Sequence, residues 1–122
     1  MIPTLLVLAS LMGAAGVVLA AAAAHAAPGA GLDSAAYLLL FHAVAVLGIA
    51  ALERQGLLWP PAALAAMAGV VLGGVLFAGD VSMRAFAGHR LFPMAAPTGG
   101  TLLIIAWLVL ALASIVMAVR GR

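Results

Sequence analysis

The 122-residue chain has no cysteine and no lysine, and it carries only three acidic residues. Without cysteine it can form no disulfide, no thiolate nucleophile and no cysteine-ligated metal site. Its five basic residues are all arginine, and a net charge of +2 makes no patch for nucleic acid. Charged residues make up 7% of the chain, whereas soluble domains contain about 25%. This composition excludes a water-soluble domain.

Apolar residues make up 68% of the chain and are gathered in four long runs. Each run has 18 to 23 residues without Asp, Glu, Lys or Arg. The runs are Leu5 to Ala27, Ala35 to Leu52, Ala62 to Gly79 and Leu102 to Val119. A helix needs about 20 apolar residues to cross the hydrocarbon core of a bilayer. The sequence therefore predicts an all-α fold: a polytopic membrane protein with a four-transmembrane-helix bundle, in one integral membrane domain over residues 1–122.

Turn and capping residues set the expected helix ends, which give spans of about 4–26, 35–53, 61–87 and 99–119. Asp33 or Ser34 is expected to cap the second helix, and Thr98 the fourth. Trp59 and the two prolines that follow it open the third helix with an interfacial aromatic and a proline-tolerant first turn. Three short connections then account for nearly all remaining residues.

The position at which the third helix ends determines whether Asp80 and Arg84 lie on a helix or in a loop. A helix that stopped at Gly79 would leave a long loop up to Thr98. A helix that continues to Ala87 is more economical, because no breaker intervenes and Gly88 suits the position just after a helix. Asp80 and Arg84 then lie at positions i and i+4 with the acid first, which is the favourable order for an ion pair.

The first run has an alternative interpretation as a cleaved signal peptide, since Ala24, His25 and Ala26 form an A-x-A pattern. The first residues carry no Lys or Arg, and the run is longer than a typical signal-peptide core. We therefore expect a retained transmembrane helix.

Arginine counts give the expected orientation. Four spans place both termini and the loop near residues 53–60 on one side of the membrane. That side carries Arg54, Arg120 and Arg122, while the other carries Arg84 and Arg90. The positive-inside rule therefore favours cytoplasmic termini, by a margin of one arginine.

Five polar residues are expected to gather in the outer half of the bundle: His25, His42, Asp80, Arg84 and His89. Charged groups within a span normally face the interior and pair, so contact between the Asp80–Arg84 pair and His25 or His42 is a hypothesis. The simpler interpretation is structural: an interfacial ion pair, a buried His42 bonded to a carbonyl or a neighbouring side chain, and a solvated His89. No metal site and no catalytic arrangement is predicted.

Small residues indicate close helix packing. Gly69 and Gly73 form a G-x-x-x-G face, which favours contact within the monomer or between copies. Gly99 and Gly100 at the start of the fourth helix are predicted to serve the same purpose.

These features resemble a known family. The chain combines A-H-A at the end of the first helix, Tyr37 and His42 in the second, L-F-A-G-D up to Asp80, and G-H-R-L-F-P-M-A-A-P-T-G-G up to Gly100. This order is similar to the YgdD-like family, small four-helix inner-membrane proteins of unknown function. The resemblance implies a bacterial inner-membrane location and family-type positions at His25, His42, Gly79, Asp80, Pro97, Gly99 and Gly100. Tyr37 precedes His42 by five residues rather than the four of the family pattern.

Three functions remain open. The first is a non-enzymatic accessory or structural protein without a cofactor, whose partners are the lipid bilayer and either further copies of the chain or another membrane protein. The second is a small transporter or channel that uses Asp80. The third is a haem-, quinone- or lipid-headgroup-binding protein that uses His25 and His42, with Arg84 and Arg90.

Overall fold

The computed structural model describes residues 1–121 of the chain and contains four helices in that range. Helix α1 spans Ile2–His25, α2 spans Leu32–Arg54, α3 spans Pro60–Ala87 and α4 spans Ala95–Arg120. Arg122, which the orientation argument counts, lies outside the described residues. All four helices are long and apolar enough to cross a membrane, so the chain is a multi-pass membrane protein with an all-helical fold.

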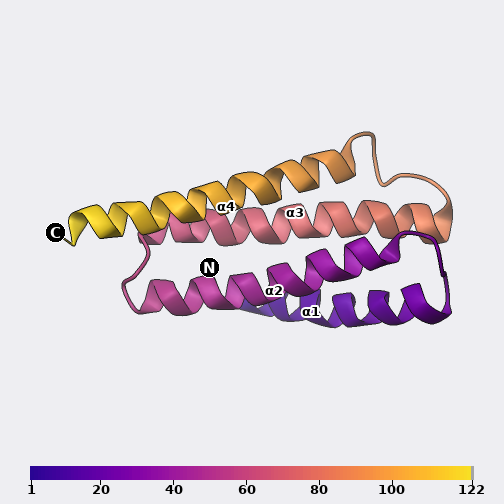
Figure 1. Cartoon of the computed structure of the whole chain (residues 1–122), viewed down its shortest axis with the longest axis horizontal. Coiled ribbons are helices and arrows are strands. Elements are labelled where there is room, and N and C mark those ends of the chain that lie inside the picture. The colour runs from indigo at the N-terminus through magenta and orange to yellow at the C-terminus, as the bar shows by residue number, and fades with distance from the viewer. Residues whose placement is uncertain (122) are drawn as a thin grey trace.

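The helices form two antiparallel hairpins, α1–α2 and α3–α4, which pack together through α2 and α3 (Figure 1). The C-terminus and the loop before α3 lie at one end of the molecule, and the other two loops lie at the opposite end (Figure 1). Helix α4 lies along α3, whereas α1 packs mainly on α2 and contacts α3 over a short stretch. This arrangement leaves α1 and α4 as the two outer helices.

Two of the expected helix caps are wrong. Helix α2 begins at Leu32 after Gly31, which has φ 80°, and neither Asp33 nor Ser34 caps it. The Ser34 hydroxyl instead donates to the Gly31 carbonyl at 2.9 Å. Helix α4 begins at Ala95, before Thr98, because a proline within the first turn costs no intrahelical hydrogen bond. The loop from Gly88 to Met94 is correspondingly shorter than expected.

Helix α3 runs without a break to Ala87 and ends at Gly88, whose φ of 77° suits a residue without a side chain. The longer of the two predicted forms of this helix is therefore the one in the structure. It places Asp80 and Arg84 in the last two turns of α3, with Arg84 near the negative end of the helix dipole.

The seam between α3 and α4 depends on glycine. A Cβ atom on Gly99 would lie 2.7 Å from both the Gly73 carbonyl oxygen and the Phe77 amide nitrogen. A Cβ on Gly69 would meet the Ala106 side chain at 3.1 Å. A Cβ on Gly100 would meet nothing within 4 Å. Of the four glycines predicted for packing, Gly69, Gly73 and Gly99 therefore line this intramolecular seam and Gly100 does not.

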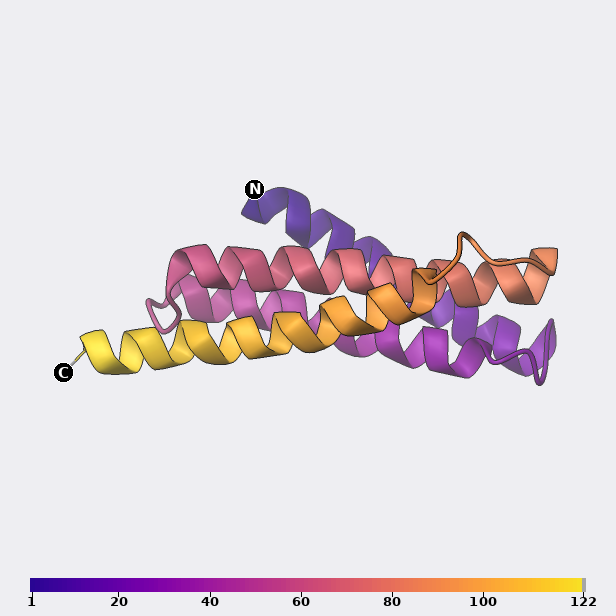
Figure 2. The same cartoon turned by 90° about the horizontal axis from the view of Figure 1, so that it is seen from above.

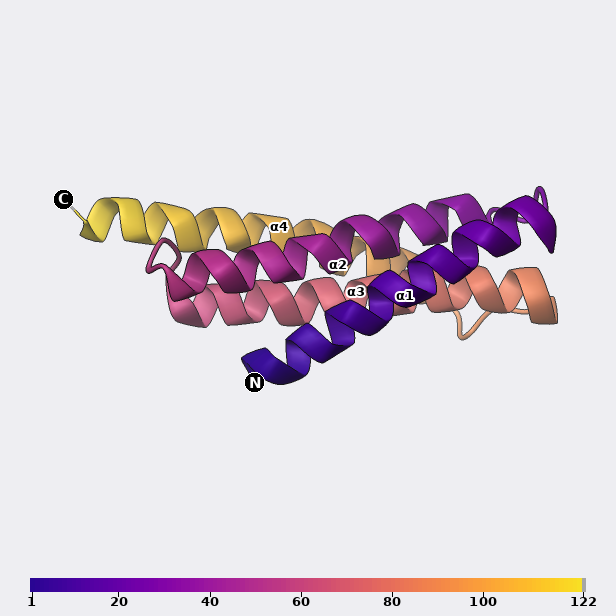
Figure 3. The same ribbon diagram turned by 90° about the horizontal axis from the view of Figure 1, so that it is seen from below.

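Helix α1 crosses α2 and α3 at an angle rather than running parallel to them (Figures 2 and 3). Figures 2 and 3 view the molecule from opposite sides, and both show α1 inclined to the axes of α2 and α3. Its buried residues are few, and all four of them, Leu5, Ala9, Met12 and Gly16, lie between positions 5 and 16. A cavity lined by residues 8–19 of α1 and residues 75–82 of α3 lies between these two crossing helices.

Candidate functional site

Among the charged residues within positions 1–121, Asp80 is the most deeply buried, with 2% of its surface exposed. One carboxylate oxygen lies 3.4 Å from an Arg84 guanidinium nitrogen, one helical turn further along α3. The Arg84 side chain is 45% exposed, so only the acid is taken out of solvent. Because a buried carboxylate is costly when it is unpaired, the contact with this arginine offsets part of the cost of burying the acid.

The second oxygen of Asp80 fixes the loop that follows α3. It accepts a hydrogen bond of 2.9 Å from the Leu91 backbone N–H. The loop residue is eleven positions away in sequence, so this bond folds the 88–94 segment back over the end of α3. Both oxygens of Asp80 therefore have partners within the chain, and the residue joins α3, Arg84 and the loop into one unit.

His42 lies near the middle of α2, about 15 Å along the helix axis from Leu32. Its Nδ1 is 2.8 Å from the Leu38 carbonyl oxygen, and its Nε2 is 3.1 Å from the Trp107 indole Nε1. Indole N–H groups only donate, so Nε2 accepts and Nδ1 carries the proton that goes to Leu38. A neutral His42 with both nitrogens bonded thus links α2 to α4.

Breaking the His42–Trp107 hydrogen bond is expected to cost a measurable but modest free energy. Trp107→Phe and His42→Ala should each lower the free energy of unfolding by about 1 kcal/mol or more, since each strands a polar group within the span. Their double-mutant coupling should be about 0.5–1.5 kcal/mol, in the range of hydrogen bonds between membrane helices. Denaturation by SDS in mixed micelles measures it. Additive single effects would contradict a direct bond.

The two remaining histidines lie at the loop end of the bundle and are exposed. His89 Nδ1 is 3.0 Å from the Arg90 carbonyl oxygen in the turn after α3. Within residues 1–121, His25 has no side-chain hydrogen bond or ion pair, and neither His25 nor His42 bonds to Asp80 or Arg84. The described residues also contain no group of three or more potential metal ligands.

The five polar residues that were expected to gather in one cluster therefore do not form one, and only Asp80 and Arg84 contact each other. His42 is further from the loop end than expected because α2 begins at Leu32 rather than Ala35. It meets Trp107 of α4. Because an indole and an imidazole on separate helices leave no local spacing pattern, this pair has no signature in a single sequence.

Glu53 is a polar residue of this fold that the sequence analysis did not single out. It lies in the last turn of α2, where the helix dipole disfavours a negative charge. One of its carboxylate oxygens is buried without a hydrogen-bond partner. The side chain lines a cavity of about 580 Å³ together with Met1, Pro60 and Pro61, and the two prolines have no N–H to offer it.

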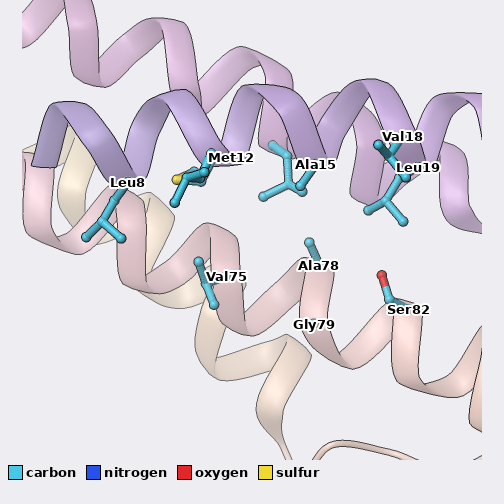
Figure 4. A pocket seen from close by; sticks show the side chains of 11 residues that line it. Leu8, Met12, Ala15, Val18, Leu19, Val75, Ala78, Gly79 and Ser82 are labelled. Carbon is cyan, nitrogen blue, oxygen red and sulfur yellow. The ribbon is translucent and has the colours of Figure 1, made fainter.

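An apolar groove lies between α1 and α3 and encloses about 570 Å³. Figure 4 shows side chains from the two helices facing each other across it. The residues from α1 are Leu8, Leu11, Met12, Ala15, Val18 and Leu19. The residues from α3 are Val75, Ala78, Gly79 and Ser82, and α2 adds Leu39. We refer to this feature as the α1–α3 groove.

Both walls of the α1–α3 groove follow helical spacing. Members of the α1 wall recur at intervals of three or four residues, as do all four members of the α3 wall. The α3 wall is made of small residues over its last two turns, namely Ala78, Gly79 and Ser82. Stripes of this kind permit close approach of another helix in lipid.

Ser82 supplies the polar atom of the α1–α3 groove. Its hydroxyl points from α3 toward α1 (Figure 4). Ser10, Ser114 and Thr101 each donate to the carbonyl four residues earlier. No such bond is found for Ser82 within residues 1–121, so its hydroxyl is available to a group that enters the groove.

Comparison with protein families gives one result. A family model described as "Protein of unknown function (DUF423)" matches residues 12–100, which is well over half of the chain. The match runs from the middle of α1 to the first turns of α4 and includes the Asp80–Arg84 pair, the 88–94 loop and Gly99. No curated protein and no solved structure matches the chain.

Proposed function

The chain belongs to the DUF423 family, and we propose that it is a non-enzymatic accessory protein that binds a transmembrane helix of a membrane-protein partner, or of a second copy, in the α1–α3 groove. The observation that carries this proposal is the groove itself. Two helices that cross without filling the space between them leave an apolar cavity of about 570 Å³ within the span. Its small-residue wall on α3 matches what helix association in lipid requires.

The free hydroxyl of Ser82 favours a helix over an acyl chain as the occupant. Serine at membrane helix interfaces donates hydrogen bonds across to a partner helix. The hydrocarbon part of an acyl chain offers no acceptor to the hydroxyl. A backbone carbonyl of a partner helix would accept this bond where a small or polar side chain leaves that carbonyl uncovered.

The bonding of the polar residues supports an accessory role over transport or haem binding. A transport carboxylate must release its partner to take up a substrate or proton, whereas both Asp80 oxygens hold the end of α3 together. A histidine that ligates haem needs a free ring nitrogen, whereas His42 uses both. Asp80 and His42 are therefore both occupied by contacts within the fold.

The location follows from the sequence features. The resemblance to YgdD-like proteins and the arginine distribution support a bacterial inner membrane with cytoplasmic termini. In this orientation Asp80, Arg84 and the 88–94 loop lie at the outer surface, and Glu53 at the inner one.

A groove-filling substitution tests the proposal. Ala15→Phe places a large side chain in the α1–α3 groove, while Ala14→Phe places the same side chain on an adjacent exposed position that does not line it. We expect affinity purification from native membranes after cross-linking to recover a stoichiometric partner with wild type and Ala14→Phe. Recovery with Ala15→Phe should fall at least about tenfold, as expected for the loss of about 1.4 kcal/mol of binding energy. Equal recovery with both variants, or isolation of the wild type as a lone monomer, would refute a groove-bound partner.

A further inference from the structure

Two arginines and one carboxylate line another, smaller cavity at the loop end of α3. Phe77, Asp80 and Arg84 of α3, Arg90 of the loop, and Pro97 and Gly100 of α4 enclose about 370 Å³. We call this cavity the arginine pocket. The two guanidinium groups and the single carboxylate leave it with a net positive charge.

Asp80 organises the arginine pocket, but its single negative charge does not neutralise both arginines. One of its oxygens holds Arg84, and the other holds the N–H of Leu91, the residue after Arg90. The same buried carboxylate thus fixes the helix that carries one arginine and the loop that carries the other. Arg84 contacts it through one nitrogen, and a guanidinium has five N–H donors, so donors remain for a ligand.

The remaining walls add to the positive potential and supply an apolar floor. Ala96 and Pro97 belong to the first turn of α4, where the helix dipole is positive. The ring of Phe77 lines both the arginine pocket and a neighbouring cavity of about 430 Å³, and Arg84 also lines both. An anion that carries an apolar chain matches this combination better than a small hydrophilic ion.

We propose that the arginine pocket binds a phosphate group between Arg84 and Arg90. Guanidinium groups recognise phosphate oxygens through paired, charge-assisted hydrogen bonds. The pocket lies at the end of a membrane-spanning helix, the depth at which phospholipid headgroups lie, so the phosphate belongs to an anionic phospholipid. Asp80 acts here as a positioning residue. This site is separate from the α1–α3 groove, and the proposal does not depend on the proposed function.

Native mass spectrometry of the detergent-purified protein with added lipid tests this site. We expect phosphatidylglycerol to be retained in preference to phosphatidylcholine. Arg84→Gln combined with Arg90→Gln should lower this retention at least about tenfold, since each lost charge-assisted bond reduces affinity. Arg54→Gln combined with Arg120→Gln removes the same charge at the opposite end and should leave retention unchanged. Ala15→Phe should also leave it unchanged, which separates this test from that of the groove.

A second arm separates the two sources of phosphate. Inorganic phosphate at millimolar concentration should neither raise the melting temperature nor displace phosphatidylglycerol if the ligand is a lipid. Arginine-dependent protection by inorganic phosphate without lipid retention would overturn the lipid assignment. Retention that falls equally in the Arg54/Arg120 variant would overturn the site, because it would reflect net charge alone. Matching melting temperatures of the variants show that each is folded.

Discussion

Gly99→Ala is expected to lower the free energy of unfolding by about 1–3 kcal/mol, because the added methyl group overpacks a closed seam. Its Cβ would lie 2.7 Å from two backbone atoms of α3, the Gly73 carbonyl oxygen and the Phe77 nitrogen. Backbone atoms cannot rotate away as a flexible side chain would, so α4 must move away from α3 to relieve the overlap. The shift would also strain the Trp107–His42 hydrogen bond, which depends on the position of α4.

Gly100→Ala is the matched control for this prediction. It adds the same methyl group one residue further along α4, where nothing lies within 4 Å. Alanine is also the better helix former, so this variant should be neutral or slightly more stable. SDS denaturation in mixed micelles measures both variants. Equal stability of Gly99→Ala and Gly100→Ala would contradict the close α3–α4 contact.

Asp80→Ala is expected to destabilise the protein by about 2–3 kcal/mol. The substitution removes the partner of Arg84 and leaves the Leu91 N–H without its acceptor. Arg84 is nearly half exposed and can be solvated, which keeps the loss below that of a fully buried pair. Asp80→Asn should cost less, about 1 kcal/mol, because its amide oxygen can still accept the Leu91 hydrogen bond.

Asp33→Ala provides the comparison for Asp80, since Asp33 is an exposed acid at the start of α2 without a capping bond. Its removal should change the stability by less than about 0.5 kcal/mol. Hydrogen exchange of the 88–94 loop adds a local readout, since loss of the Asp80 bond should speed exchange at Leu91. A loop that exchanges at the wild-type rate in Asp80→Ala would contradict its role in holding the loop.

The sequence was sufficient to predict four spans, the extent of α3 and the i, i+4 placement of Asp80 and Arg84. Each of these depends on local features, such as run length, the glycine at position 88 and helical spacing. It was also sufficient to indicate that Gly69 and Gly73 form a close-packing face, although not which helix would meet them. That helix is α4, which approaches through Gly99.

The features that the sequence did not predict depend on which helix faces meet. In a soluble helix the polar side marks the solvent face, but in lipid both the core face and the lipid face are apolar. The sequence therefore contains no pattern that would orient α1 toward the groove or bring Trp107 to His42. The hydrogen bond from Leu91 to Asp80 could not be predicted for a related reason. Its donor is a backbone N–H, which nearly every residue has, so no residue type marks the position.

The central claim, that the α1–α3 groove holds a partner helix, is tested most directly by photo-cross-linking within native membranes. A photoreactive residue at Val75, which lines the groove, is compared with one at Ile104, an exposed apolar position on α4. We predict a discrete cross-linked protein species from position 75, lost on Ala15→Phe, and only diffuse lipid adducts from position 104. Lipid adducts alone from both positions would contradict a helix-binding groove.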